Sequence, residues 1–227
     1  MTAPLPLPFR SQSLWLSAGR CLFWEEMSTL VVSDLHFGKA GHFRKAGIAV
    51  PAEVNRDDLQ RLVDETRRFG ARRLILTGDF FHSTGNLELE RFARWRDALA
   101  VDEMVLVRGN HDILRMPDYA RLGLSLQEGS LTLPPFRFVH DPHDSHGADG
   151  VSYTFAGHLH PGVRLAGLGK QSLRLPCFYF GADTAILPAF SRFTGLALMD
   201  PGLAEHVFAV VPGEPRGRGP ASLVRLR

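Results

Sequence analysis

The stretch VVSDLHFGKAGHFRKAGIAVP, residues 31–51, begins as a buried strand and then stops on an acid and a histidine, Asp34 and His36. Side chains two residues apart on an extended chain point to the same side, so these two groups can hold one ligand together. The connection that follows is rich in Gly, His, Lys and Arg. Loops of this length are uncommon inside a compact domain and are often functional. The stretch therefore predicts a strand that leads into a functional site.

The composition is that of an ordinary globular protein. The chain has 227 residues, of which 44% are hydrophobic and 22% charged, which is enough for a large core. Its two cysteines form no CxxC spacing and no disulfide framework, which favours a reducing compartment. The first residues do not read as a signal peptide, and no apolar run approaches the roughly 18 residues of a membrane helix. We therefore expect a cytoplasmic protein with no membrane partner.

The first half of the chain alternates between strand and helix patterns. In order, we expect a hairpin in residues 13–24, a strand in 28–34, a helix from Pro51 to Gly70, a strand in 72–79, a helix in 86–99 and a strand in 103–112. The helix before Gly70 has apolar residues at three-to-four spacing, which gives one buried face. This order is typical of a parallel sheet with crossover helices.

From about residue 124 the pattern changes to short apolar strands with no strong helix. One domain over residues 1–211, with an α/β first half and a β-rich second half, is the simplest prediction. The end of the chain, residues 212–227, is predicted to be a basic and flexible tail, because its last thirteen residues hold four arginines and no acid. The net charge of +2 is too small to indicate nucleic acid by itself, although such a tail can also contact phosphates.

Side chains that can bind metals follow strand after strand. They are Asp34 and His36, then Asp79, then Asn110 and His111, then His140, and finally His158 and His160. Taken singly, each has an ordinary explanation as turn chemistry or as a surface histidine. Because ligands of an open α/β sheet gather at the carboxyl ends of its strands, we expect these groups to meet in one region.

Carboxylate, imidazole and amide oxygen donors together suit divalent metals such as Mn, Fe or Zn. Eight candidate groups are too many for one ion and enough for two. Two ions about 3.5–4 Å apart need a bridging ligand, and Asp79 is the best candidate for that role. The sequence therefore predicts a metal site.

The blocks DLH, GD, GNHD, a lone histidine after a strand, and GHLH resemble those of the calcineurin-like metallophosphoesterases in order and spacing. The resemblance implies an α/β fold of two packed, mixed β-sheets flanked by helices. It implies one ion held by Asp34, His36 and His160, a second held by Asn110, His140 and His158, and Asp79 between them. It also implies that His111 donates to the substrate phosphate or leaving oxygen, with Asp112 as its orienting partner, while water activated by the metals attacks phosphorus.

The segments DLHFGKAGHFRKAGIAVP, GDFFHS, GHLHP and LPAFSRFTG resemble the bacterial branch described as ligase-associated DNA-damage-response endonucleases. This resemblance implies a nuclease in DNA repair with two ions, most readily Mn, although Fe, Zn and Mg also fit. It implies DNA with single strands or ends as the substrate, and a DNA ligase and a helicase as partners. The protein phosphatases of the superfamily carry an arginine shortly after the second aspartate, where this chain has Phe80, Phe81 and His82, which argues against a phosphoprotein phosphatase.

Several weaker candidates surround these blocks. His82, Arg44 and Lys45 are candidates for contacting the substrate, since they lie near the metal blocks or in the long basic loop. His143 and His146 compete with His140 for its ligand role, but His140 directly ends an apolar strand. Ligands on rigid elements are positioned best, so we favour His140. Two alternatives stay open: an enzyme for small phosphoesters such as nucleotides, and a scaffold that has lost its chemistry.

Overall fold

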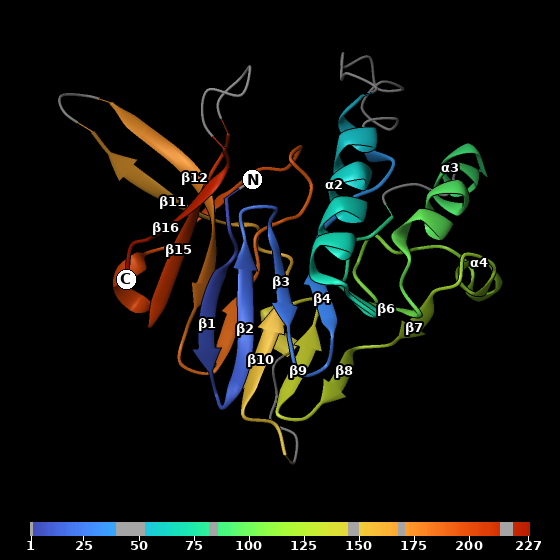
Figure 1. Ribbon diagram of the computed structural model, residues 1–227, viewed down its shortest axis with the longest axis horizontal. Helices are drawn as coiled ribbons and strands as arrows, with labels where there is room; N and C mark the ends of the chain where they lie inside the picture. The colour runs from blue at the N-terminus through green and yellow to red at the C-terminus, as the bar shows by residue number, and fades with distance from the viewer. Residues whose placement is uncertain (1, 40–52, 82–85, 145–149, 168–170, 214–219) are drawn as a thin grey trace.

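Two β-sheets lie face to face in the computed structural model, and helices cover the outer face of the first sheet (Figure 1). The structure describes residues 2–39, 53–81, 86–144, 150–167, 171–213 and 220–227. The two packed sheets and the flanking helices confirm the fold that the sequence implied.

The first sheet joins an antiparallel half to a parallel half. Its strand order is β1-β2-β3-β4-β5-β6-β7. The antiparallel strands are β1 (Leu5–Phe9), β2 (Gln12–Ser17), β3 (Cys21–Trp24) and the adjoining β4 (Thr29–Val32). From β4 onward the pairing is parallel, through β5 (Arg73–Thr77), β6 (Glu103–Val107) and β7 (Ser125–Gln127). Parallel strands end on the same edge, so the residues that follow β4, β5 and β6 come together.

The helices of the first half connect the parallel strands. They are α2 (Glu53–Phe69), α3 (Asn86–Arg96), the 3-10 turn η1 (Asp97–Leu99) and α4 (Met116–Arg121). The apolar face expected for the first helix is buried, with Leu59, Leu62 and Val63 packed in one cluster with Leu30 and Leu74 of the sheet. Helix α4 was not predicted, because six residues are too few to show a helical repeat. Among the described residues, no helix has the length and apolar character needed to cross a bilayer.

The second sheet is built from the second half of the chain. Its strands, in chain order, are β8 (Ser130–Leu133), β9 (Phe136–Val139), β10 (Tyr153–Ala156), β11 (Pro161–Ala166), β12 (Ser172–Phe180), β13 (Thr184–Ile186), β14 (Ala197–Leu198), β15 (His206–Val211) and β16 (Ser222–Arg225). Short 3-10 turns, η2 (Pro142–Asp144) and η3 (Pro201–Leu203), interrupt them. Strands β9, β10 and β13 run parallel to one another, so their ends also share an edge.

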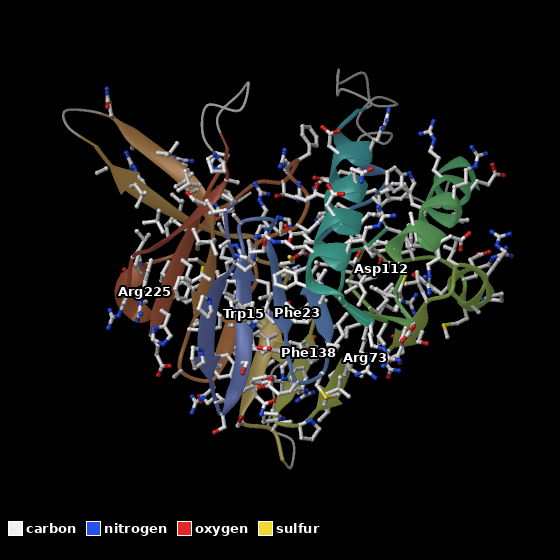
Figure 2. The ribbon with its side chains drawn as sticks, viewed as in Figure 1. Trp15, Phe23, Arg73, Asp112, Phe138 and Arg225 are labelled. Carbon is white, nitrogen blue, oxygen red and sulfur yellow. The ribbon has the colours of Figure 1, made fainter. Side chains whose placement is uncertain are left out.

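The interface between the sheets is rich in aromatic residues. The Trp24 ring on β3 meets the Phe136 ring on β9 at a centroid distance of 4.9 Å. Phe23 and Phe138, labelled in Figure 2, belong to the two separate clusters on the outer and inner sides of the first sheet. The sheet is therefore buried on both faces, which explains why β4 to β6 read as continuous apolar runs.

Part of the segment expected to be a flexible tail is a strand. β16 pairs antiparallel with β15, from Val211↔Ser222 to Phe208↔Arg225. The Arg225 guanidinium lies 5.9 Å from the centroid of the Phe208 ring, and Leu223 packs against the core between the sheets. A charge-based reading of the tail overlooks these main-chain bonds, which make residues 222–225 part of the second sheet.

Candidate metal centre

The residues that follow five strands meet at one edge of the structure. β4 leads to Asp34 and His36, β5 to Asp79, and β6 to Asn110 and His111 of the first sheet, while β9 leads to His140 and β10 to His158 and His160 of the second. Two clusters of close ligand atoms result, each within 4.8 Å, namely Asp34, His36 and His160, and Asp79, His140 and His158. These clusters contain the groups that the sequence implied for two ions.

The first cluster is closely packed and buried. His36 Nε2 lies 3.2 Å from His160 Nε2, and Asp34 Oδ1 lies 3.6 Å from the same His160 nitrogen. Burial alone would raise the pKa of Asp34, but contacts with His160 and Ser33 outweigh it and hold the pKa below its usual value. The carboxylate is therefore charged at neutral pH and faces two imidazoles.

The second cluster adjoins an amide oxygen. His140 Nε2 lies 3.1 Å from His158 Nδ1, 3.5 Å from Asp79 Oδ1 and 3.0 Å from Asn110 Oδ1. The structure thus brings Asn110 to the same cluster, as the resemblance implied. His140 is buried, whereas its competitor His143 has a side chain that is 83% exposed.

The two clusters fit divalent metal ions. Two donors that are each about 2.1 Å from one ion lie roughly 3.0–3.4 Å apart at ordinary coordination angles, and the imidazole pairs have this spacing. Among the described residues, Asp34 Oδ1 is a buried oxygen that accepts no hydrogen bond. Such an oxygen is costly without a partner, and a cation would satisfy it.

The backbone of the ligand residues is unusual. Five of them have a positive φ, a value that is uncommon outside glycine, namely Asp34 at 51°, His36 at 49°, Asp79 at 47°, His158 at 67° and His160 at 49°. Hydrogen bonds from main-chain N–H groups stabilise these turns: His36 N–H donates to the main-chain oxygen of Asp79 at 2.8 Å, and His158 N–H donates to Asp34 Oδ2 at 3.0 Å. Residues held in such conformations cluster at functional sites.

Glycine precedes several of these residues because the strand ends approach closely. A Cβ added to Gly78 would lie 2.0 Å from His140 Nδ1, and the φ of Gly78 is +80°. A Cβ added to Gly157 would lie 1.9 Å from Ser33 Oγ and 2.7 Å from Asp34 Oδ2. Glycine is therefore required for the two sheets to bring their ligands together.

Gly157→Ala is expected to lower the free energy of unfolding by about 1–3 kcal/mol, the usual cost of overpacking, and to weaken metal binding. The added methyl group must displace Ser33 or the Asp34 carboxylate. Urea unfolding of the metal-free protein and metal titration measure the two effects. Gly195→Ala is the matched control, because a Cβ there meets nothing within 4 Å. Unchanged stability and metal affinity in Gly157→Ala would contradict this account of the strand packing.

Asp112 is fully buried and acts through the main chain. Its carboxylate accepts hydrogen bonds from the N–H groups of Phe80 and Phe81, at 3.0 and 2.9 Å, and of Gly109, at 3.0 Å. Burial raises the pKa of Asp112 to about 6, although these N–H groups lower it. The resemblance implied that Asp112 orients His111; its contacts show that it links the loops that follow β5 and β6.

His111 faces solvent beside the second cluster. Its N–H donates to Asp79 Oδ1 at 2.9 Å, and its Nε2 lies 3.9 Å from Asp79 Oδ2. Its side chain is 44% exposed, and its ring lies 5.6 Å from that of His36. An imidazole in this position can contact a phosphate that is bound beside Asp79.

Three residues near the centre were missed in the sequence. Ser33 Oγ donates to Asp34 Oδ2, and Asp141 Oδ2 lies 3.8 Å from His158 Nε2. Burial lowers the pKa of Lys39, while the charges of the nearby Asp79 and Asp34 raise it. Ser33 directly precedes the DLH block, Asp141 directly follows His140, and Lys39 lies three residues after His36; this closeness is the signal that the sequence offers. The weaker candidates His82, Arg44, Lys45 and His146 lie outside the described residues.

The model of the calcineurin-like phosphoesterase family matches residues 27–176. The chain belongs to this family, and it is therefore a phosphoester hydrolase that uses divalent metal ions. Comparison with curated protein sequences gives no match.

Among solved structures, the chain is similar to the Pseudomonas putida nuclease MPE, with a TM-score of 0.77 and 29% sequence identity. The alignment covers 96% of this chain and 100% of that nuclease. The chain also matches a protein of unknown function, AQ665 from Aquifex aeolicus, with a TM-score of 0.43 and 16% sequence identity. That alignment covers 63% of this chain and 82% of AQ665.

Proposed function

We propose that the protein is a dinuclear-metal phosphodiesterase that cleaves DNA with single strands or ends. The observation that carries this proposal is the pair of adjoining ligand clusters at one edge of the sheets, beside the exposed His111. Two-metal sites of this kind suit in-line displacement at phosphorus. The similarity to a nuclease over nearly the whole chain supports a diester as the substrate.

The chain offers a complete ligand set for two ions. Asp34, His36 and His160 would hold one ion, Asn110, His140 and His158 would hold the other, and Asp79 would lie between them. Mn is the ion that we expect, while Fe, Zn and Mg are compatible with the same donors. When bound, such ions polarise phosphoryl oxygens and lower the pKa of water.

The protein residues around the ions position the substrate and stabilise charge. His111 would donate a hydrogen bond to the phosphate or to the leaving oxygen. Its exposed side chain lies beside the proposed metal ligand Asp79, with Nε2 3.9 Å from Asp79 Oδ2, where a bound phosphate is within reach. Asp79 keeps His111 in place by accepting its main-chain N–H. Asp112 fixes the loops that carry both residues through the N–H groups of Phe80 and Gly109.

The proposal is tested by hydrolysis of bis-p-nitrophenyl phosphate, its monoester and a circular DNA single strand, with and without Mn²⁺. We expect Mn-dependent cleavage of the diester and of the circle, since a circle is cut only by an endonuclease. Cleavage of the monoester alone would replace the proposal with a small-molecule phosphoesterase. Absence of hydrolysis with Mn²⁺, and with Fe²⁺, Zn²⁺ or Mg²⁺ in its place, would favour a scaffold.

His140→Ala and His143→Ala form a matched pair for the same assay. Removing the buried His140 takes a donor from the second cluster, so we expect a loss of more than about 100-fold, because even outer-shell partners cost 10–100-fold. The exposed His143 contacts Asp141 at 2.7 Å, and its removal is expected to leave most of the activity. Equal losses would refute the assignment of His140.

We further propose a role in DNA repair in the cytoplasm, together with a DNA ligase and a helicase. The support is the resemblance of the segments GDFFHS and LPAFSRFTG to the ligase-associated branch. Co-purification of the tagged protein from DNA-damaged cells, followed by mass spectrometry, tests these partners. Recovery of neither enzyme would count against them.

A further inference from the structure

A cavity lies next to the segment that follows β13. It has a volume of about 320 Å³ and is lined by Ala18, Arg20, Arg192, Val210, Pro212, Gly213 and Ala221. We call it the Arg20–Arg192 pocket. It is formed by the β2–β3 turn, the segment after β13 and the ends of β15 and β16.

The pocket and the metal centre share one edge of the fold. Arg20 directly precedes β3, whose Leu22 pairs with Val31 near the carboxyl end of β4. On the other wall, Ser191 N–H donates to the main-chain oxygen of the ligand residue Asp34 at 3.2 Å. Arg192 follows Ser191, so its Cα lies roughly 10 Å or less from that of Asp34, as standard bond lengths require.

Main-chain oxygens hold the guanidinium of Arg20, and it forms no ion pair with any carboxylate that the structure describes. Its Nη1 donates to the main-chain oxygens of Ala189 at 3.2 Å and Ser191 at 2.8 Å. These two bonds tie it to the segment that contacts Asp34. Arg20 is half-buried, so its charge is only partly hydrated.

Among the described residues, the acids beside this pocket already have basic partners. The carboxylate of Glu65, next to Gly19, lies 3.8 Å from Arg68 Nη1. The buried Asp58 is already engaged by Arg61, at 2.9 Å, and by the main-chain N–H of Arg192, at 3.2 Å. Burial, and then the charge of Arg61, lowers the pKa of Arg20 to about 10. Arg192 is exposed and forms no ion pair within the described part of the chain. An anion would therefore be favoured here.

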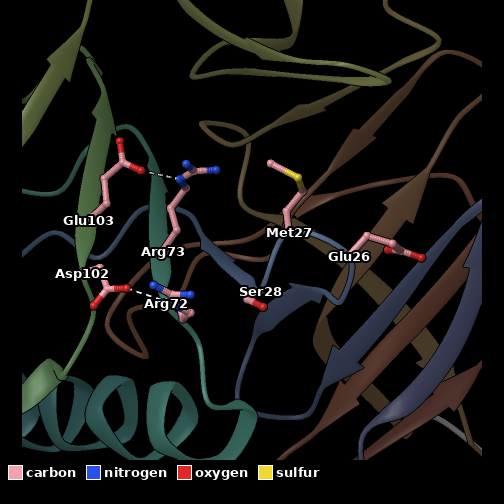
Figure 3. Close-up of a pocket in the computed structure, with 7 residues that line it drawn as sticks. All are labelled: Glu26, Met27, Ser28, Arg72, Arg73, Asp102 and Glu103. Atoms are coloured by element: carbon pink, nitrogen blue, oxygen red, sulfur yellow. Dashed lines mark hydrogen bonds and ion pairs between the residues drawn. The ribbon is translucent and has the colours of Figure 1, made fainter.

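The pocket at the opposite edge of the first sheet provides a contrast (Figure 3). It is of similar size, about 370 Å³, and also contains two arginines. There, however, Arg72 pairs with Asp102 at 2.8 Å and Arg73 pairs with Glu103 at 2.5 Å. Because the charges of those two arginines are neutralised, an anion is not favoured in that pocket.

We propose that the Arg20–Arg192 pocket binds a backbone phosphate of the nucleic-acid strand whose scissile phosphate lies at the metal centre. This inference rests on the proposed nuclease function and adds a subsite to it. Guanidinium groups bind phosphate through two parallel hydrogen bonds. With successive phosphates at least about 3.4 Å apart, the subsite lies a few nucleotides from the cleaved bond.

Arg192→Gln tests the subsite, and Arg72→Gln is the matched control with the same loss of charge. Binding of a fluorescein-labelled DNA single strand is measured by anisotropy in EDTA, which prevents cleavage, over a range of salt concentrations. We expect Arg192→Gln to weaken binding roughly five- to tenfold, as the loss of one charge-assisted contact. Its plot of log affinity against log salt should be less steep by about 0.7. Arg192→Lys should restore part of the affinity, since lysine keeps the positive charge but lacks the two parallel N–H donors of a guanidinium.

Hydrolysis of bis-p-nitrophenyl phosphate separates this inference from the proposed function. That small diester has a single phosphate, the one that is cleaved, and no second phosphate for the pocket to bind, so Arg192→Gln should cleave it as the wild type does. If the wild type does not cleave this diester, the proposed chemistry at the metal centre is contradicted. The strand-binding measurement still tests the subsite, because it does not depend on cleavage. Unchanged strand affinity in Arg192→Gln, or an equal loss in Arg72→Gln, would overturn the subsite.

Discussion

Replacing Asp79 with asparagine is expected to reduce Mn-dependent diester hydrolysis more than about 100-fold and to lower the number of bound ions. The reason is that we propose Asp79 as a ligand shared by the two ions; in the second cluster its Oδ1 lies 3.5 Å from His140 Nε2, and its Oδ2 lies 3.9 Å from His111 Nε2. Asparagine keeps the shape and an oxygen that can accept the His111 N–H, but it removes the negative charge. Losing a metal ligand should cost more than the 10–100-fold that is typical of its outer-shell partners.

Metal content by mass spectrometry and the rate of diester hydrolysis are the two measurements. Asp102→Asn is the control, because Asp102 has a 65% exposed side chain and pairs with Arg72 at the other edge of the sheet. The two variants lose the same charge, so a difference between them isolates the metal centre. Full activity with two ions bound in Asp79→Asn would show that Asp79 is not a shared ligand.

Asp112→Ala is expected to lower the free energy of unfolding by about 3 kcal/mol or more. The substitution leaves three buried N–H groups, those of Phe80, Phe81 and Gly109, without their acceptor, and each such group costs about 1–3 kcal/mol. The loops after β5 and β6 should lose their shape as well, so diester hydrolysis should fall with stability.

Asp112→Asn provides a graded comparison for this prediction. Its remaining oxygen can still accept from Phe80 and Phe81, so that only the bond from Gly109 is lost and the stability should fall by about a third as much. Urea unfolding of the metal-free proteins measures the free energies of unfolding. We expect them to fall from the wild type to Asp112→Asn to Asp112→Ala. An alanine variant as stable as the wild type would mean that these hydrogen bonds do not hold the loops.

The metal centre could be predicted because each of its residues lies within four positions after the end of a strand. In a parallel sheet the carboxyl ends share an edge, so blocks such as GD and GNHD are brought together by topology alone. The pairing of His160 with Asp34, 126 positions earlier, depended instead on the resemblance to a known family. No local pattern states which histidine of the second sheet meets which acid of the first.

Other features were hidden because they depend on tertiary contacts. Strand β1 contains Pro6 and Pro8, which argue against a strand except at an edge, and β1 is an edge strand with Leu7 and Phe9 buried. The Arg20–Arg192 pocket combines residues from widely separated parts of the chain. Asp112 binds main-chain N–H groups, which are the same in every sequence, so its structural role left no pattern to detect.

Each ligand cluster takes residues from both sheets, and this has a consequence for the order of events during folding. Asp34 and His36 belong to the first sheet and His160 to the second, just as Asp79 faces His140 across the same junction. Closing such distant contacts is a slow, late step compared with forming local structure. A chain emerging from the ribosome therefore cannot complete either cluster until His158 and His160, about seven tenths of the way along the 227 residues, have been made. Metal loading would then report that the two sheets have met, and a chain truncated before His158 would lack a ligand of each cluster.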